Sequence, residues 1–204
     1  MGILRELFGP SKEEIWQQLS AEINGRYVAG GFWTGDKVEA THGQWTITLD
    51  VPVITVGRRT NNSLTRMRAP YVNPDGFRFM VYRRSVFSEI AQWFGMQDVK
   101  VGYEPFDHDF VIKGNDEAKL RLLFANARIR YLIAAQPDIL FTVKDDEGWF
   151  EAPFPKGVDE LYFEVMDDIE DLERLKLLYE LFAETLDQLC HIGSAYENRP
   201  DVSL

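Results

Sequence analysis

The sequence predicts an α+β fold: a mainly antiparallel sheet with helices packed on one face and a long C-terminal helix. Residues 26–84 predict the sheet, because β-branched and aromatic residues recur there at a period of two, with glycine-rich breaks between them. Apolar residues recur at helical spacing in 10–24, 116–136 and 168–192, which predicts three amphipathic helices.

The length of 204 residues fits a single domain, 1–204, of slightly large size. The alternative is two sub-units that share an interface, a strand-rich 1–104 and a helix-rich 105–204. A content of 45% hydrophobic residues, with 14 Phe, 8 Tyr and 5 Trp, excludes a disordered chain. The antiparallel sheet is expected to continue with strands near 106–113, 139–143 and 161–165.

The first helix, expected over 10–24, has a clear start signal. Ser11 and Glu14 have the spacing of a capping box, in which each side chain accepts a hydrogen bond from the other residue's backbone amide. The following apolar residues form one stripe that faces a core, namely Ile15, Trp16, Leu19 and Ile23.

A β-hairpin is predicted over 64–84. Asn73-Pro74-Asp75-Gly76 is a typical turn sequence, since proline presets the backbone angle of the second turn position and glycine accepts a positive φ. Two strand-like runs, 64–72 and 77–84, flank this turn. They are therefore expected to pair directly with each other.

The last helix, expected over 168–192, is the strongest single element. Its first turns contain several carboxylates, which interact favourably with the positive end of the helix dipole. Its apolar stripe is expected to pack on the helix 116–136. The contact residues predicted for this pair are Leu120, Phe124 and Leu132 on one helix and Leu175, Phe182 and Leu186 on the other.

Charge is distributed unevenly along the chain. The net charge is −11, but residues 1–104 carry 12 Lys and Arg against 11 Asp and Glu, whereas residues 105–204 carry 10 against 22. Overall acidity disfavours nonspecific nucleic-acid binding, which electrostatic repulsion would weaken. The longest apolar run is far shorter than the about 18 residues of a membrane span. With a single cysteine, Cys190, and no signal peptide, a cytoplasmic location is expected.

The candidate binding site is an arginine cluster in the predicted hairpin. Residues 58–84 hold seven arginines and one acid, Asp75. In strands, Arg66 and Arg68 share one face, as do alternate residues of the second run. If the register aligns these faces, guanidinium groups beside tyrosines would form a site for phosphate, carboxylate or a stacked base. The candidate residues are Arg66, Arg68, Tyr71, Arg78, Tyr82 and Arg84.

Three interpretations of this cluster remain open. The arginines are solvated or pair with the acidic C-terminal half, or they dock an acidic protein partner, or they bind a nucleotide or nucleic acid. Arginine and aromatic residues are the types enriched at the centres of protein interfaces.

No catalytic or metal-binding motif stands out. Asp107-His108-Asp109 is the densest group of metal-ligand types, but in an extended strand His108 would point away from its two neighbours. Cys190 and His191 are neighbours on a helix and so diverge. No metal or cofactor is therefore expected.

The segment 106–117, FDHDFVIKGNDE, resembles a pattern found in uncharacterised bacterial protein families of unknown function. The resemblance covers about residues 77–195, and it continues into a helix with the core residues Leu120 to Phe124. Such families often carry membrane helices, which this sequence lacks. The resemblance implies a bacterial cytosolic protein without an assigned reaction, and it implies no catalytic residue.

The sequence thus favours a non-enzymatic cytosolic binding or adaptor protein that recognises an acidic protein partner through the arginine-rich hairpin, or that self-associates. One alternative is a hydrolase that uses carboxylates around Asp107 and Asp109 or in the turn Asp145-Asp146, and it requires an enclosed pocket containing at least two of them. The other alternative is a nucleotide- or nucleic-acid-binding module.

Overall fold

The structure is a computed structural model that describes residues 10–31, 35–51, 54–56, 59–61, 64–86, 97–145, 154–202 and 204. Its α-helices are α2 (Lys12–Glu22), α3 (Glu104–Asp109), α4 (Glu117–Ala125), α5 (Ala127–Ala134) and α6 (Leu172–His191). Within the described residues, no helix is both long and apolar enough to cross a membrane.

Nine of the described strands form one sheet, in which every neighbouring pair is antiparallel. In spatial order they are β1 (Arg26–Val28), β2 (Lys37–His42), β3 (Trp45–Asp50), β6 (Thr65–Val72), β11 (Val158–Val165), β10 (Leu140–Lys144), β7 (Phe79–Arg83), β9 (Phe110–Gly114) and β8 (Gln97–Asp98). A separate hairpin consists of β4 (Ile54–Val56) and β5 (Arg59–Asn61). The predicted α+β class, with an antiparallel sheet and a long C-terminal helix, is confirmed.

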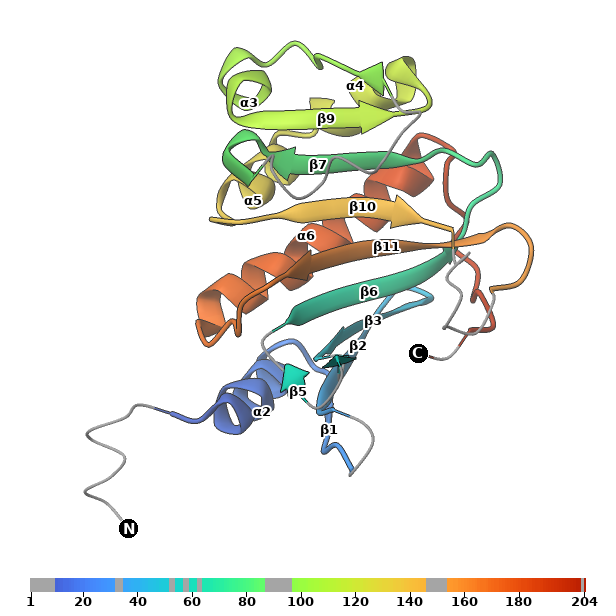
Figure 1. Cartoon of the computed structure of the whole chain (residues 1–204). Helices are drawn as coiled ribbons and strands as arrows, with labels where there is room; N and C mark the ends of the chain where they lie inside the picture. The colour runs from blue at the N-terminus through green and yellow to red at the C-terminus, as the bar shows by residue number, and fades with distance from the viewer. Residues whose placement is uncertain are drawn as a thin grey trace.

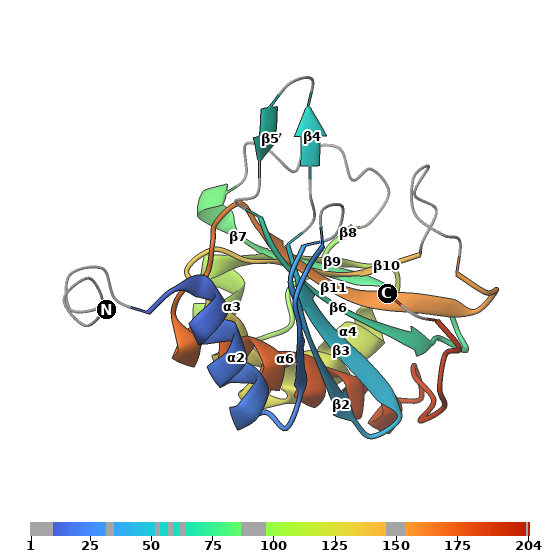
Figure 2. The same ribbon diagram turned by 90° about the horizontal axis from the view of Figure 1, so that it is seen from below.

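Helices α2, α4 and α6 lie on the side of the sheet opposite the β4–β5 hairpin. Figure 2 shows α2, α4 and α6 below the sheet and β4 and β5 above it. Strands from the two halves of the chain alternate in the centre, where β11 and β10 lie between β6 and β7 (Figure 1). Residues 1–104 and 105–204 therefore contribute to one sheet.

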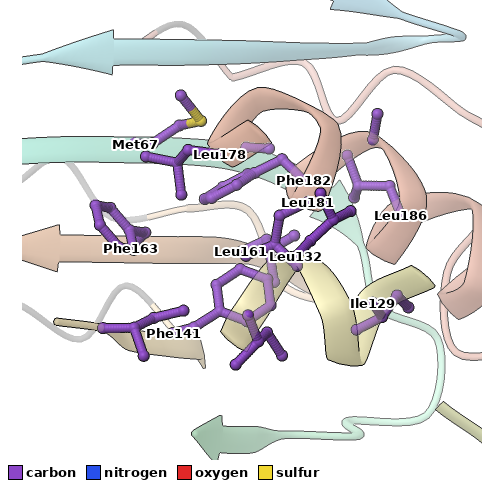
Figure 3. Packing of buried hydrophobic residues seen from close by; sticks show 14 of the residues in the cluster. Met67, Ile129, Leu132, Phe141, Leu161, Phe163, Leu178, Leu181, Phe182 and Leu186 are labelled. Carbon is purple, nitrogen blue, oxygen red and sulfur yellow. The ribbon is translucent and has the colours of Figure 1, made fainter. Parts of the chain in front are cut away.

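The main hydrophobic core lies between the helices and the sheet. Figure 3 shows the rings of Phe141, Phe163 and Phe182 at its centre, with Leu132 of α5 beside α6. Each of these side chains is buried. The predicted packing of the two helical regions 116–136 and 168–192 against each other is confirmed, since α4 and α5 both contact α6.

Local sequence signals predict the start of α2 correctly and the start of α6 only approximately. The capping box of Ser11 and Glu14 is present at the start of α2, with both side chains bonded to the other residue's amide. The start predicted at 168 lies four residues early, because the side chain of Asp171 caps α6 by accepting from the Arg174 amide.

The prediction of one helix over 116–136 is wrong. Asn126 ends α4 and also caps α5, because its side-chain oxygen accepts from the amides of Arg128 and Ile129. The apolar period continues through this residue, so the pattern did not reveal the break.

The predicted β-hairpin over 64–84 is also wrong. The turn itself forms, with Gly76 at a φ of +70° and its amide bonded to the Asn73 side chain. The two strands do not pair, however, because β6 pairs with β3 and β11 whereas β7 pairs with β10 and β9. The paired hairpin in this part of the sheet is β10–β11, which lies between them.

Candidate functional site

Arg66 and Arg68 lie on the sheet face opposite the helices and share one carboxylate. Arg66 donates from Nε to Asp50 Oδ1 at 2.8 Å and from Nη2 to Oδ2 at 2.9 Å, and Arg68 Nη2 donates to the same Oδ2 at 2.9 Å. The three side chains are only 12%, 8% and 15% exposed, in the order Arg66, Arg68 and Asp50. The arginine pair is therefore bonded within the protein.

Two residues of β11 lie beside Arg66 and Arg68 on the same face of the sheet. Tyr162 is paired with Arg68 and Glu164 with Arg66 across the ladder, and the Tyr162 hydroxyl donates to Glu164 Oε2 at 2.5 Å. Burial, followed by the charge of Glu164, raises the pKa of Tyr162 well above its usual value, so the phenol remains a donor at neutral pH. The result is a network of partly buried polar groups.

Tyr82 lies on the same face but further away. It occupies the cross-strand row of Leu140, Glu164 and Arg66, at three strand spacings, or about 14 Å, from Arg66. With Met80, Val111 and Leu140 it forms a small apolar cluster. The structure thus places Arg66, Arg68 and Tyr82 on one face, and Asp50 joins the two arginines.

The remaining candidates lie elsewhere. Tyr71 points into the main core, where burial and the charge of Asp159 raise the pKa of its hydroxyl. Arg78 binds Asp159 at 3.3 Å and also contacts Asp145. Arg84 donates to backbone carbonyls of residues 107, 108 and 110. The six predicted site residues therefore do not form one site.

The carboxylates of Asp107 and Asp109 are bonded to different partners. Residues 104–109 are the helix α3, whereas a strand was predicted to begin at about 106. Asp107 accepts hydrogen bonds from the amides of Val101, Gly102 and Tyr103 at 2.8–3.1 Å, and Gly102 has a φ of +94° in this turn. Asp109 is 53% exposed and bonds to His108.

The other groups that the sequence singled out form no reactive centre in the described part of the chain. Asp145 pairs with Arg78, and Asp146 lies outside the described residues. Cys190 is a free thiol whose pKa is raised by burial, which makes the thiolate less available. Among the described residues, no group of three or more His, Cys, Asp or Glu is placed to hold a metal ion.

Asp75 ties the turn between β6 and β7 to the helical layer. It binds Lys119, and it accepts from the Phe77 amide at 2.9 Å and from the Ser194 hydroxyl at 3.1 Å. Burial would raise the pKa of Asp75, but these hydrogen bonds outweigh it and hold the pKa below its ordinary value.

Asp75 is therefore expected to make the protein less stable in acid. A carboxyl whose pKa is lowered by folding stabilises the folded state above its unfolded pKa of about 4, and this contribution is lost as the pH falls through the folded value. In urea denaturation between pH 7 and pH 3, Asp75→Asn should lower stability at pH 7 and reduce the loss on acidification. Parallel pH profiles for both proteins would contradict this.

Helices α4 and α5 also carry an exposed surface that no sequence pattern predicts. Leu122 and Tyr131 are 54% and 55% exposed, although both belong to helices with fully buried inner faces. The guanidinium of Arg128 lies 5.0 Å from the Tyr131 ring centroid. This surface, defined here as Leu122, Arg128 and Tyr131, is called the α4–α5 surface below.

Comparisons with known proteins give a similar fold and no family. No protein-family description and no curated protein matches the sequence. The structure is similar to the crystal structure of the mycobacterial trehalose monomycolate transport factor A, TtfA, with a TM-score of 0.54. The match covers 87% of this chain and 94% of that chain, at 6% sequence identity. At that identity the similarity concerns the fold alone.

Proposed function

We propose that the protein is a non-enzymatic binding or adaptor protein that docks an acidic protein partner on the α4–α5 surface. The observation that carries the proposal is the exposure of Leu122 and Tyr131 on one helix pair, with Arg128 stacked on the tyrosine. Arginine and tyrosine are typical of the centres of protein interfaces, where they combine apolar area with hydrogen bonding.

Contacts with α6 fix the positions of Leu122 and Arg128 in the α4–α5 surface. The Leu122 carbonyl accepts from Gln188 at 3.2 Å, and Arg128 donates to both carboxylate oxygens of Glu180 at 2.6–2.7 Å. Gln188 and Glu180 are eight residues apart on α6, which is about 12 Å along a helix. Leu122 and Arg128 therefore contact α6 at points about two turns apart. This distance suits the docking of a short segment of a partner protein.

Local charge supports an acidic partner. Residues 117–135 carry four Lys and Arg and one Glu. Of these cations, Arg121 and Arg128 are half exposed and pair with exposed carboxylates, those of Glu117 and Glu180. The pair between Arg128 and Glu180 is 44% and 41% exposed. Exposed ion pairs contribute little, so a partner carboxylate can exchange with Glu180.

This proposal keeps the acidic partner but moves the contact surface. Arg66, Arg68 and Arg78 already bind carboxylates inside the protein, which weakens any docking role for them. The same pairing, with a net charge of −11, weakens the nucleotide and nucleic-acid alternative. The cytoplasmic location inferred from the single Cys190 stays part of the proposal.

The test is capture of a partner from native extract by full-length protein, followed by a binding measurement with that purified partner. Leu122→Ser/Tyr131→Ser should lower affinity at least tenfold, and added salt should weaken binding of the unsubstituted protein because Arg128 contributes. The matched control is Met166→Ser/Tyr196→Ser, since these side chains are 65% and 52% exposed elsewhere. Equal capture by both double variants, or self-association as the sole interaction, would contradict the proposal.

A further inference from the structure

Three polar side chains meet where β7 ends, α5 ends and α6 begins. Arg83 donates from Nη2 to the carbonyls of Ala134 at 3.2 Å and Gln136 at 3.0 Å. Arg174, in the first turn of α6, donates from Nε to Gln136 Oε1 at 3.2 Å. Gln136 is fully buried and therefore connects the two arginines, one through its backbone and one through its side chain.

Each of these side chains has a buried nitrogen that finds no hydrogen-bond partner in the described part of the chain: Arg83 Nε, Gln136 Nε2 and Arg174 Nη2. All three are donors. Leaving a donor buried and unpaired costs about 1–3 kcal/mol, so such groups are rare in folded proteins. Three around one residue indicate that an acceptor belongs here.

The geometry shows where the acceptor belongs. The Nε and Nη2 donors of a guanidinium form one fork on the same side. Because Arg174 Nε binds Gln136 Oε1, the Nη2 donor of the same fork is on the side of the guanidinium that faces the Gln136 amide. Two donors cannot satisfy each other. Turning the amide over would place Nε2 against Arg174 Nε instead, so it does not resolve the conflict.

Charge indicates what kind of acceptor fits. Among the described residues, Arg83 has no carboxylate partner, since it binds carbonyls and stacks at 4.7 Å on the Phe110 ring. Arg174 is 15% exposed, and its ion pair with the exposed Asp167 is long at 3.4 Å. A water molecule would satisfy the donors without neutralising these cations, whereas an anion does both.

We propose that Arg174 Nη2 and Gln136 Nε2 bind one oxygen of a carboxylate ligand, with Arg83 supplying further positive charge. The acids nearby on the β11–α6 connection are Asp167, Asp168, Glu170 and Asp171, which disfavour a dianion such as phosphate. A single carboxylate, from a small acid or from an acidic protein segment, matches both the donors and this surrounding charge. This site is independent of the α4–α5 surface.

The first test is thermal unfolding of the full chain in sodium acetate, compared with sodium chloride and inorganic phosphate at equal ionic strength. Acetate should raise Tm saturably, by about 3–5 °C at ten times its dissociation constant. Arg174→Met should abolish the shift, and the control Arg26→Met, at a 74% exposed arginine of β1, should keep it. No acetate effect would overturn the proposal in favour of a bound water, and a shift with phosphate alone would overturn the choice of carboxylate.

A second variant keeps the test valid if Arg174→Met does not fold. Gln136→Glu replaces Nε2 by an acceptor of nearly the same size, so that the Arg174 fork can bind both carboxylate oxygens. This variant should have a higher Tm than the unsubstituted protein in chloride and no response to acetate. A lower Tm in chloride, or an unchanged acetate response, would overturn the proposal.

Discussion

Phe141→Ala is expected to lower the free energy of unfolding by about 3–5 kcal/mol, because it leaves a cavity at the centre of the core. Phe141 is fully buried, and its ring meets those of Phe79 at 5.6 Å and Phe182 at 5.5 Å, both edge to face. Figure 3 shows Phe141 and Phe182. Phe141 thus links a sheet strand with the longest helix. Urea denaturation followed by circular dichroism measures the loss.

Two controls separate the cavity from other effects. Phe141→Leu keeps most of the volume and should be less destabilising than alanine. Tyr131→Ala removes a similar ring from the exposed surface and should change stability little. If Phe141→Ala costs no more than Tyr131→Ala, the ring does not pack in the folded protein as described.

Asp50→Ala is expected to lower the free energy of unfolding by about 3 kcal/mol. It removes the carboxylate that Arg66 and Arg68 share in a largely buried ion network, while their positive charges stay in place. Asp50 accepts three hydrogen bonds from Arg66 and Arg68, and the three side chains are almost fully covered. At the size of this chain, the loss corresponds to a decrease of roughly 6–12 °C in Tm, measurable by calorimetry.

The control is another aspartate on the same sheet. Asp98 pairs with Lys113 at 3.3 Å but is 72% exposed, so solvent screens the pair. Asp98→Ala should leave Tm almost unchanged. If the two substitutions have equal effects, the Asp50 network does not exclude solvent, and its arginines become available for an outside ligand.

The arginine cluster illustrates how far a local charge pattern predicts function. Among the arginines whose side chains the structure describes between residues 58 and 84, three bind carboxylates and two bind backbone carbonyls. Pairing across the sheet connects Arg78 with Asp159, from the acidic half of the chain. The uneven charge along the sequence is therefore partly balanced within the fold, as one of the three interpretations proposed.

The residues of the two proposed sites gave no signal in the sequence. Leu122 and Tyr131 belong to an apolar period that predicts a buried face, and only the break at Asn126 and the position of α6 leave them outside. Gln136 has no distinctive neighbours in the chain. Its amide oxygen is bound by Arg174, 38 residues away, and its amide nitrogen has no hydrogen-bond partner within the described residues.

The sequence by itself determined the elements that depend on neighbours within a few residues. These include the capped start of α2, the turn at Asn73 to Gly76 and the amphipathic α6. Tertiary structure alone decided which strands pair. A turn sequence fixes how the backbone reverses, but burial of Phe141 and Phe163 favours insertion of β10–β11 between β6 and β7. Strand order depends on this nonlocal burial of apolar surface, which no local pattern encodes.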